Sequence, residues 1–283
     1  MGLRFGEFYP EVQAGLSFEV ESVLYSGQSR FQKIEVLQTK GFGRMLLLDG
    51  MVMLCERDEF IYHEMIAHVP LFTHPHPRAV LVIGGGDGGT VRECLRHPAV
   101  QRIDLVEIDE MVTRVCLQYF PALASPLLAE RVQIHFRDGV EFVRQAGQRY
   151  DVILIDSTDP VSVGEGLFSA EFYENCRKIL NPGGILVTQS ESPAWQQQNL
   201  QNISRKLRAV FPKVYYYQAH IPTYPSGHWL FGLASEVYHP QRDFHAARCR
   251  EYNLAFRYYN EEIHAGAFAL PGFVKELLGG TDE

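Results

Sequence analysis

The sequence predicts an α/β protein with a mostly parallel main sheet and a β-rich first part. Three observations support this prediction: apolar and polar residues alternate before residue 58, strand-like and helix-like segments alternate after it, and a glycine-rich loop follows a short apolar run. We therefore expect two domains, residues 1–57 and residues 58–283. A chain of 283 residues, 46% of them hydrophobic, is long enough for one large α/β domain and a smaller one.

The first domain is predicted to consist of β-strands because its apolar residues recur at every second position. This pattern predicts strands over residues 18–25 and 31–37. It also predicts a hairpin over residues 45–54, because Asp49 and Gly50 form a dipeptide that two-residue turns favour. From residue 58 the period changes, and residues 60–69 are predicted to form a helix that covers the ligand crevice.

The second domain alternates strands with helices. The predicted strands cover residues 80–83, 103–109, 132–136, 151–155, 185–188, 214–217 and 229–233. Alternation of this kind indicates a mostly parallel sheet with helices on both faces, and ligands of such sheets bind outside the carboxyl ends of the strands.

The glycine loop is the most informative segment of the chain. Gly84, Gly86 and Gly89 match the G-x-G-x-x-G pattern between a strand and a helix, and Glu107 at the end of the next strand can accept hydrogen bonds from ribose hydroxyls. The alternative is a tight turn without a ligand. Asp87 within the loop would repel a pyrophosphate at the helix N-terminus. The loop therefore suits an adenosyl sulfonium, which has no phosphates and carries positive charge, better than NAD.

Carboxylates follow five consecutive predicted strands. They are Asp87, Glu107 with Asp109, Asp138, Asp156 with Asp159, and Glu191. Each could simply cap a helix or form a local turn, as Asp156 and Asp159 would in an Asx-turn before Pro160. Gathered in one crevice, however, like charges raise each other's pKa unless cations balance them. We therefore expect the crevice to bind a polycation.

Composition and spacing argue against several other classes of protein. A formal charge of −8 disfavours a nucleic-acid partner, and no apolar run reaches the length that spans a membrane. The scattered cysteines suggest reduced thiols and a cytoplasmic location: Cys55, Cys94, Cys116, Cys176 and Cys249. His63 and His68 are five residues apart, roughly 140° around a helix, so they cannot share a metal. No metal site is predicted.

Several motifs, taken in order, are familiar. They are Glu56–Ile66, Gly84–Gly89, Glu107–Asp109, Asp138–Gly139, Asp156–Pro160, Ile221–Gly227 and Arg257–Asn260. Together they resemble the spermidine synthases, or polyamine aminopropyltransferases, over nearly the whole chain. The aspartate among the glycines and the Asp-Ser-Thr-Asp-Pro turn distinguish this pattern from ordinary methyltransferases.

The resemblance implies a small β-stranded N-terminal domain, used in oligomerisation and as part of an active-site lid. A Rossmann-like, methyltransferase-like core with a seven-stranded, mostly parallel sheet should follow it. The implied reaction transfers the aminopropyl group of decarboxylated S-adenosylmethionine to putrescine, giving spermidine and 5′-methylthioadenosine. The implied partners are the donor and a small diamine, with a homodimer or homotetramer as the assembly. No permanently bound cofactor and no metal are implied.

The resemblance also assigns residues. The implied donor-binding residues are Gln32, Glu107, Asp138, Gly139 and Val163, with Glu107 on the ribose and Asp138 on the adenine amino group. The implied substrate-binding residues are His63, Asp87, Asp156, Ser157, Thr158, Asp159 and Tyr224. Asp156 is the implied proton acceptor, assisted by Tyr62.

Two segments depart from the family pattern and leave alternatives open. Val163 stands in the altered loop 161–166, where the family usually has a proline, and residues 189–195 belong to a variable part of the acceptor site. Cadaverine, agmatine or spermidine therefore remain alternative acceptors. A methyltransferase that uses S-adenosylmethionine and a non-catalytic polyamine-binding protein are the competing functions. The former leaves Asp87 and the pair Asp156 and Asp159 unexplained.

Overall fold

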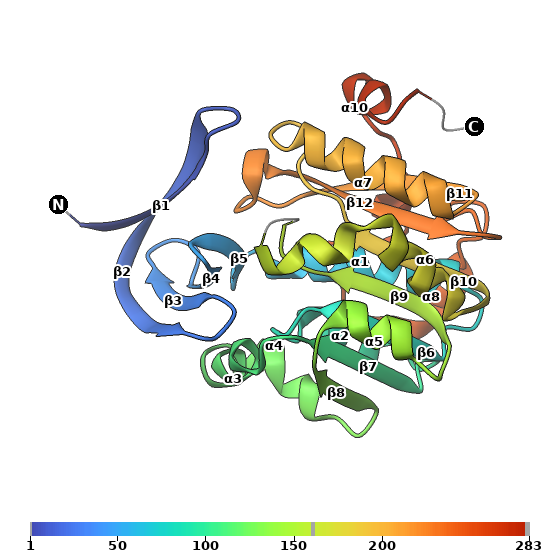
Figure 1. Ribbon diagram of the computed structural model, residues 1–283, viewed down its shortest axis with the longest axis horizontal. Coiled ribbons are helices and arrows are strands. Elements are labelled where there is room, and N and C mark those ends of the chain that lie inside the picture. Colours follow the sequence, from blue (N-terminus) through green and yellow to red (C-terminus); the bar gives the residue numbers. More distant parts are fainter. Residues whose placement is uncertain (1, 160–161, 281–283) are drawn as a thin grey trace.

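The computed structural model describes residues 2–159 and 162–280, and only the backbone of residues 162 and 163. It contains two sheets that lie side by side (Figure 1). The first sheet is antiparallel, with its strands in chain order: β1 (Leu3–Tyr9), β2 (Ala14–Gln28), β3 (Lys33–Thr39), β4 (Arg44–Leu48) and β5 (Met51–Cys55). The division into domains after residue 57 stays a prediction.

The hairpin of the first sheet forms as predicted. Leu48 pairs with Met51, and the two residues between them, Asp49 and Gly50, have φ angles of 49° and 80°. This left-handed pair matches the twist of a two-residue hairpin turn. Strand β1 was not predicted individually. It lies at the edge of the sheet, and most of its residues are exposed or only half-buried, so its apolar periodicity is weak.

The second sheet confirms the predicted fold class. Its strand order is β11-β12-β10-β9-β6-β7-β8, and the pairs from β10 to β8 are parallel, whereas β12 pairs antiparallel with β10 and β11. The strands are β6 (Ala79–Gly84), β7 (Arg102–Glu107), β8 (Val132–Phe136), β9 (Tyr150–Asp156), β10 (Leu180–Gln189), β11 (Lys213–His220) and β12 (His228–Ser235). This is a Rossmann-like, seven-stranded core.

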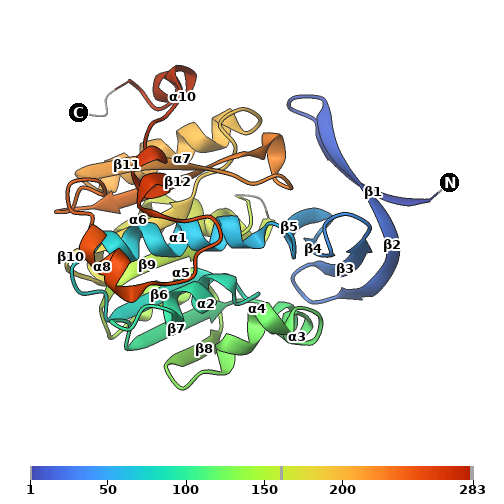
Figure 2. The same cartoon turned by 180° about the vertical axis from the view of Figure 1, so that it is seen from behind.

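Helices cover both faces of the second sheet. One face carries α5 (Gly139–Gln145), α6 (Ala170–Lys178) and α7 (Gln197–Val210) (Figure 1). The opposite face carries α1 (Glu59–Thr73), α2 (Gly89–Leu95) and α8 (Ala246–Tyr252) (Figure 2). The remaining helices are α3 (Glu110–Tyr119), α4 (Pro121–Ala124), η1 (Ser125–Leu128), η2 (Ser162–Phe168), η3 (Pro225–Gly227), α9 (Glu261–Gly266) and α10 (Gly272–Leu277).

Helix α1 links the two sheets and is buried from Ile61 to Thr73. It begins at the predicted place and extends past Pro70, four residues beyond the predicted end at residue 69. Because the helix is buried on all sides, its polar side chains must find partners inside the protein. Among the described residues, no helix is both long and apolar enough to cross a membrane.

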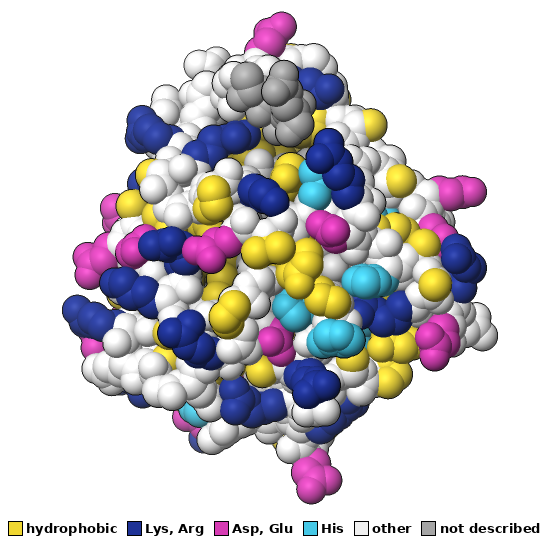
Figure 3. Space-filling view, turned by 90° about the vertical axis from the view of Figure 1, so that its right-hand side faces the viewer, with side chains coloured by type: hydrophobic (Ala, Val, Ile, Leu, Met, Phe, Trp, Pro, Cys, Tyr) yellow, Lys and Arg dark blue, Asp and Glu magenta, His cyan; other side chains and the backbone are white. Residues whose placement is uncertain are grey.

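The face of the core that points away from the first sheet has a mixed surface. Figure 3 shows acidic and basic side chains scattered over this face, around a small group of histidines and hydrophobic side chains. The candidate site lies elsewhere, where the carboxyl ends of the parallel strands approach the first sheet.

Candidate active site

A cavity of about 310 Å³ lies at the carboxyl ends of the parallel strands and is lined by residues of both sheets. The predicted site residues that line it are Gln32, Tyr62, His63, Asp87, Glu107, Asp138, Gly139, Asp156, Ser157, Thr158, Asp159 and Tyr224. Val163 belongs to η2, but its side chain lies outside the described part of the chain, so its predicted role is untested. The strand ends therefore converge on one cavity, as expected, and the first sheet forms the opposite wall of this cavity.

The glycine loop between β6 and α2 lets functional side chains approach the backbone. A Cβ atom on Gly86 would lie 2.7 Å from Oε2 of Glu107. One on Gly89 would lie 2.3 Å from Cε1 of His63. Contacts this short do not occur in real structures, so both positions require glycine in this arrangement.

Glu107 lies at one end of the cavity and is held by two backbone amides. Its carboxylate accepts hydrogen bonds from Gly86 N–H at 3.1 Å and from Asp109 N–H at 2.8 Å. Burial raises the pKa of Glu107 to about 7, although the amide of Asp109 opposes this effect. Gln32 reaches the same region from the first sheet and donates to Oδ2 of Asp109 at 3.1 Å. The two sheets thus build this end of the cavity together.

Two of the predicted acids are helix caps. Asp109 is the N-cap of α3 and accepts the N–H of Met111 at 3.1 Å. Asp138 is the exposed N-cap of α5 and accepts the N–H of Val140 at 2.7 Å. Asp138 nevertheless lines the cavity, so capping fixes the direction of its carboxylate without removing it from the site. Asp109 instead faces the first sheet.

Asp156 lies at the centre of the cavity, at the end of β9. Its Oδ2 accepts a hydrogen bond from Oγ1 of Thr90 at 2.6 Å, and the buried hydroxyl of Tyr62 donates to the same carboxylate. Burial and the neighbouring charge of Asp87 raise the pKa of Asp156. A carboxylate with a raised pKa is a stronger base than a carboxylate in water.

Asp87 is paired with a cation that the protein itself provides. Its Oδ1 accepts Gly89 N–H at 2.7 Å and lies 3.4 Å from Nε2 of His63. Burial alone would lower the pKa of His63, but Asp87 and Glu59 outweigh burial and raise it to about 10. Burial likewise opposes ionisation of Asp87, and the charge of His63 overcomes it and lowers the pKa of Asp87. Asp87 is therefore ionised and His63 is an imidazolium.

A second pair of acids is Asp159, which lines the cavity, and Glu191, which was expected in the crevice but is fully buried behind it and does not line it. Gln196 donates to Oδ2 of Asp159 at 2.7 Å, and burial raises the pKa of Asp159 to about 6. Burial and the charge of Asp159 raise the pKa of Glu191 well above its usual value. The charge of Asp159 thus favours the protonated form of Glu191. Glu191 has a φ of 71°, a left-handed conformation that non-glycine residues adopt at an energetic cost.

Tyr224 and Ser157 complete the crevice. The hydroxyl of Tyr224 donates to the backbone carbonyl of Met53 in β5 at 2.6 Å, so its lone pairs, and not its proton, remain for a ligand. The Oγ atom of Ser157 is buried and has no hydrogen-bond partner among the described residues. A buried hydroxyl without a partner costs free energy, and a ligand atom in the cavity would satisfy it.

Family models match both parts of the chain. A model described as "Spermidine synthase tetramerisation domain" matches residues 5–56, and one described as "Spermine/spermidine synthase domain" matches residues 59–245. The chain belongs to the spermine/spermidine synthase family. Its relatives by sequence include a polyamine aminopropyltransferase of Alkaliphilus metalliredigens, which is 52% identical over 93% of each chain. One of Clostridium beijerinckii is 48% identical over 94% of this chain and 95% of the relative.

Solved structures of the family have the same fold. Spermidine synthase from Thermotoga maritima superposes with a TM-score of 0.95 at 40% sequence identity, covering 99% of this chain and 96% of that one. A spermidine synthase in complex with the transition-state analogue AdoDATO gives a TM-score of 0.96, with the same identity and coverage. The predicted family and enzyme class, a polyamine aminopropyltransferase, are therefore confirmed.

Among the cavity residues that were not predicted from the sequence, two polar ones lie on β1, Glu7 and Tyr9. Tyr9 donates to Glu7 at 2.5 Å, and burial raises the pKa of Glu7 to about 7. The signal that could have identified Glu7 is a carboxylate at an inward-facing position of an edge strand. Which positions of β1 face inward depends on its pairing with β2, and this pairing was not predicted. Thr90, the partner of Asp156, was not predicted because no local pattern links it to the end of β9.

One group of residues could hold a metal ion by distance alone. His63, Asp87 and Asp156 each offer a ligand atom within 4.8 Å of the others. Metal ligation needs a free lone pair on the imidazole, however, and both ring nitrogens of His63 face carboxylates as N–H donors. The protonation state of His63 therefore suits a hydrogen-bonding role better than metal ligation.

Proposed function

We propose that this chain transfers the aminopropyl group of decarboxylated S-adenosylmethionine to putrescine, giving spermidine and 5′-methylthioadenosine. The observation that carries the proposal is a single cavity with two chemically different ends. One end has Glu107, whose carboxylate accepts the N–H of Gly86 in the glycine loop, and the other has the carboxylates of Asp156 and Asp159, whose pKa values are raised. Family membership supports the reaction class, and the complex of a related spermidine synthase with the transition-state analogue AdoDATO supports a donor of this kind.

The donor end suits an adenosine group. We assign the ribose hydroxyls to Glu107, the adenine amino group to Asp138, and further contacts to Gln32 and Gly139. Glu107 already accepts two amide N–H bonds, which leaves acceptor sites for hydroxyl donors. Val163 remains a proposed part of this pocket.

The carboxylates of Asp87 and Asp156 are suited to bind the transferred aminopropyl group and to accept a proton. We assign the ammonium of the donor to Asp87, with His63 beside it, because an ionised carboxylate binds a cation and repels the carboxylate of intact S-adenosylmethionine. The amine nitrogen forms its bond to the carbon beside the sulfonium, and the carbon–sulfur bond breaks with its electron pair moving to sulfur. Asp156 takes the proton of the amine, and Tyr62 and Thr90 orient its carboxylate.

The acceptor is proposed to be held at both ends. An alkyl diamine carries two ammonium groups at neutral pH, since amines of this type have a pKa of about 10.4. The reacting end meets Asp156, with Ser157 and Thr158 beside it, and the distal end meets Asp159 with Tyr224. The buried Oγ of Ser157 supports this assignment because it lacks a partner among the described residues.

We also propose a homodimer or homotetramer in the cytoplasm. Exposed hydrophobic side chains on the first sheet, including Leu3, Phe8 and Val23, support assembly through this region, and the matched tetramerisation domain agrees with it. The cysteines, all free and buried, support a reducing compartment.

Turnover tests the proposal. The protein is incubated with decarboxylated S-adenosylmethionine and either putrescine, cadaverine, agmatine, spermidine or butylamine, and methylthioadenosine is quantified. Putrescine should give the highest kcat/KM, and butylamine should be roughly tenfold to more than a hundredfold poorer because it lacks one charged contact. Equal values for putrescine and butylamine would contradict the two-ended acceptor site. No methylthioadenosine with any amine would favour a non-catalytic polyamine-binding protein.

A further inference from the structure

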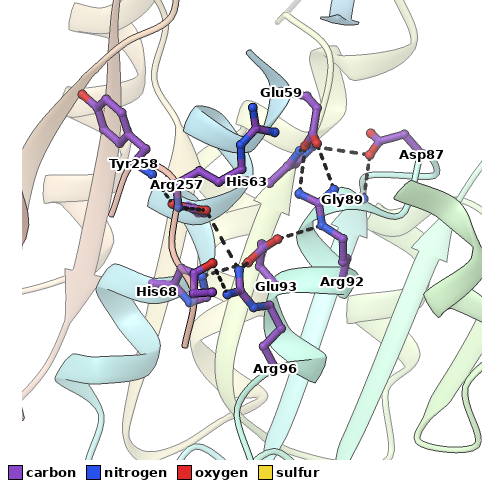
Figure 4. A network of polar contacts seen from close by, with 12 residues as sticks. Glu59, His63, His68, Asp87, Gly89, Arg92, Glu93, Arg96, Arg257 and Tyr258 are labelled. Carbon is purple, nitrogen blue, oxygen red and sulfur yellow. Dashed lines mark hydrogen bonds and ion pairs between the residues drawn. The ribbon is translucent and has the colours of Figure 1, made fainter. Parts of the chain in front are cut away.

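A network of ionised side chains extends from the cavity into the protein between α1 and α2. Figure 4 shows its members, which alternate in charge from Asp87 through His63, Glu59 and Arg92 to Glu93. Only the first two of these line the cavity. The others are not needed for contact with a substrate, so their burial requires a different explanation.

His63 is fixed by carboxylates on both sides. Its Nδ1 lies 2.6 Å from Oε2 of Glu59, one helical turn earlier on α1, and its Nε2 lies 3.4 Å from Oδ1 of Asp87. The His63 side chain is only 4% exposed, and the backbone of Gly89 contacts its ring. The contact with Glu59 is much shorter than the contact with Asp87, so Glu59 determines the orientation of the ring.

Glu59 is itself held in place by Arg92 from α2. The guanidinium makes two parallel hydrogen bonds, Nη1 to Oε1 and Nη2 to Oε2, both at 2.9 Å. Bidentate pairs of this kind fix direction as well as charge. Arg92 also donates from Nε to Oε1 of Glu93 at 2.7 Å, so it cannot follow Glu59 if the latter moves. Hydrogen bonds from His63 and Arg92 outweigh burial and lower the pKa of Glu59.

We propose that Glu59, fixed by Arg92, is a positioning residue for the transfer reaction, which holds His63 protonated and directed at Asp87. The proposal rests on the proposed function, because it explains how Asp87 stays ionised to bind the donor ammonium. The groups that face His63 are Glu59 and Tyr62 from α1, Asp87 from the glycine loop and Asp156 from β9.

The charges around His63 explain why Glu59 is needed. Asp87 and Asp156 lie close together, and two buried carboxylates of like charge favour protonation of one of them. A neutral His63 would leave this repulsion unbalanced. With Glu59 on its far side, the imidazolium keeps its proton even when a cationic substrate competes for Asp87.

The state of His63 can be measured without any turnover. The protein is labelled with ¹⁵N-histidine, the His63 signal is assigned with His63→Gln, and its imidazole nitrogens are titrated from pH 6 to pH 12. The midpoint should fall by about one to three pH units in Glu59→Gln, the range for the loss of an adjacent opposite charge. Arg92→Lys, which keeps the charge but loses the bidentate geometry, should give a smaller fall. Glu174→Gln, which removes an exposed carboxylate paired with Arg177 on α6, is the matched control and should leave the midpoint unchanged.

Kinetics provide the second measurement. In Glu59→Gln, kcat/KM for the donor at pH 8 should fall at least roughly tenfold, mainly through KM, and the high-pH limb of the profile should move to lower pH. Glu174→Gln should keep the kcat/KM for the donor and the pH profile of the unmodified protein. An unchanged His63 titration in folded Glu59→Gln and Arg92→Lys would overturn the proposal. A shifted titration in a protein that turns over no amine would instead overturn the proposed function, and only the effect of Glu59 on the protonation of His63 would stand.

Discussion

Replacing Gly86 by alanine should weaken binding of the adenosine group without a large effect on the backbone. The φ angle of Gly86 does not lie in the left-handed region, so alanine is conformationally allowed there. Its Cβ, however, would lie 2.7 Å from Oε2, 2.8 Å from Cγ and 3.0 Å from Cδ of Glu107. The whole carboxylate must therefore move.

The expected magnitude follows from what this movement removes. Displaced Glu107 loses its position against the N–H groups of Gly86 and Asp109 and no longer meets the ribose hydroxyls proposed as its ligands. The loss of one hydrogen bond to a charged group costs about 1.5–3 kcal/mol, which corresponds to roughly a tenfold to more than a hundredfold loss of affinity. We expect Gly86→Ala to weaken methylthioadenosine binding within this range.

Isothermal titration calorimetry with methylthioadenosine measures the effect directly. Gly147→Ala is the matched control, because a Cβ there has no atom within 4 Å and its φ is not left-handed. This control should bind with the affinity of the unmodified protein. A thermal melt of both variants separates lost affinity from lost folding. If folded Gly86→Ala bound methylthioadenosine as tightly as Gly147→Ala, the role assigned to Glu107 would be wrong.

Three further predictions concern the carboxylates of the cavity. Asp156→Asn should lower kcat at least roughly a hundredfold, the lower range for general-base catalysis, while methylthioadenosine affinity is kept; near-normal turnover would exclude Asp156 as the proton acceptor. Asp87→Asn should weaken binding of the decarboxylated donor and reduce the preference for it over S-adenosylmethionine. An unchanged ratio of the two dissociation constants would assign that selectivity to other residues. The pKa of Glu107 is raised to about 7, and only its ionised form can accept both hydroxyls, so methylthioadenosine affinity should fall about tenfold as the pH is lowered from 8 to 6. Glu107→Gln should lose this pH dependence, and a flat profile in the unmodified protein would contradict the assignment.

The sequence by itself predicted the fold class, the family and most of the acidic residues that line the cavity. These features are encoded locally. A strand period, a glycine loop and an acid at the end of a strand each depend on neighbouring residues, and parallel pairing then brings strand ends such as those at Glu107 and Asp156 together. The Asp49-Gly50 turn was predictable for the same reason, since its conformation depends on two residues.

Only the tertiary structure decided how these residues are held and charged. Glu7 enters the cavity because β1 pairs with β2, and Glu59 is held in place because Arg92 approaches from another helix. No local pattern encodes either contact. Crowded acids in the sequence indicated raised pKa values unless cations balance them, and only the structure shows that His63 is the cation that lowers the pKa of Asp87. Charge state depends on burial and on the nearest opposite charge, and both are fixed only when distant segments pack together.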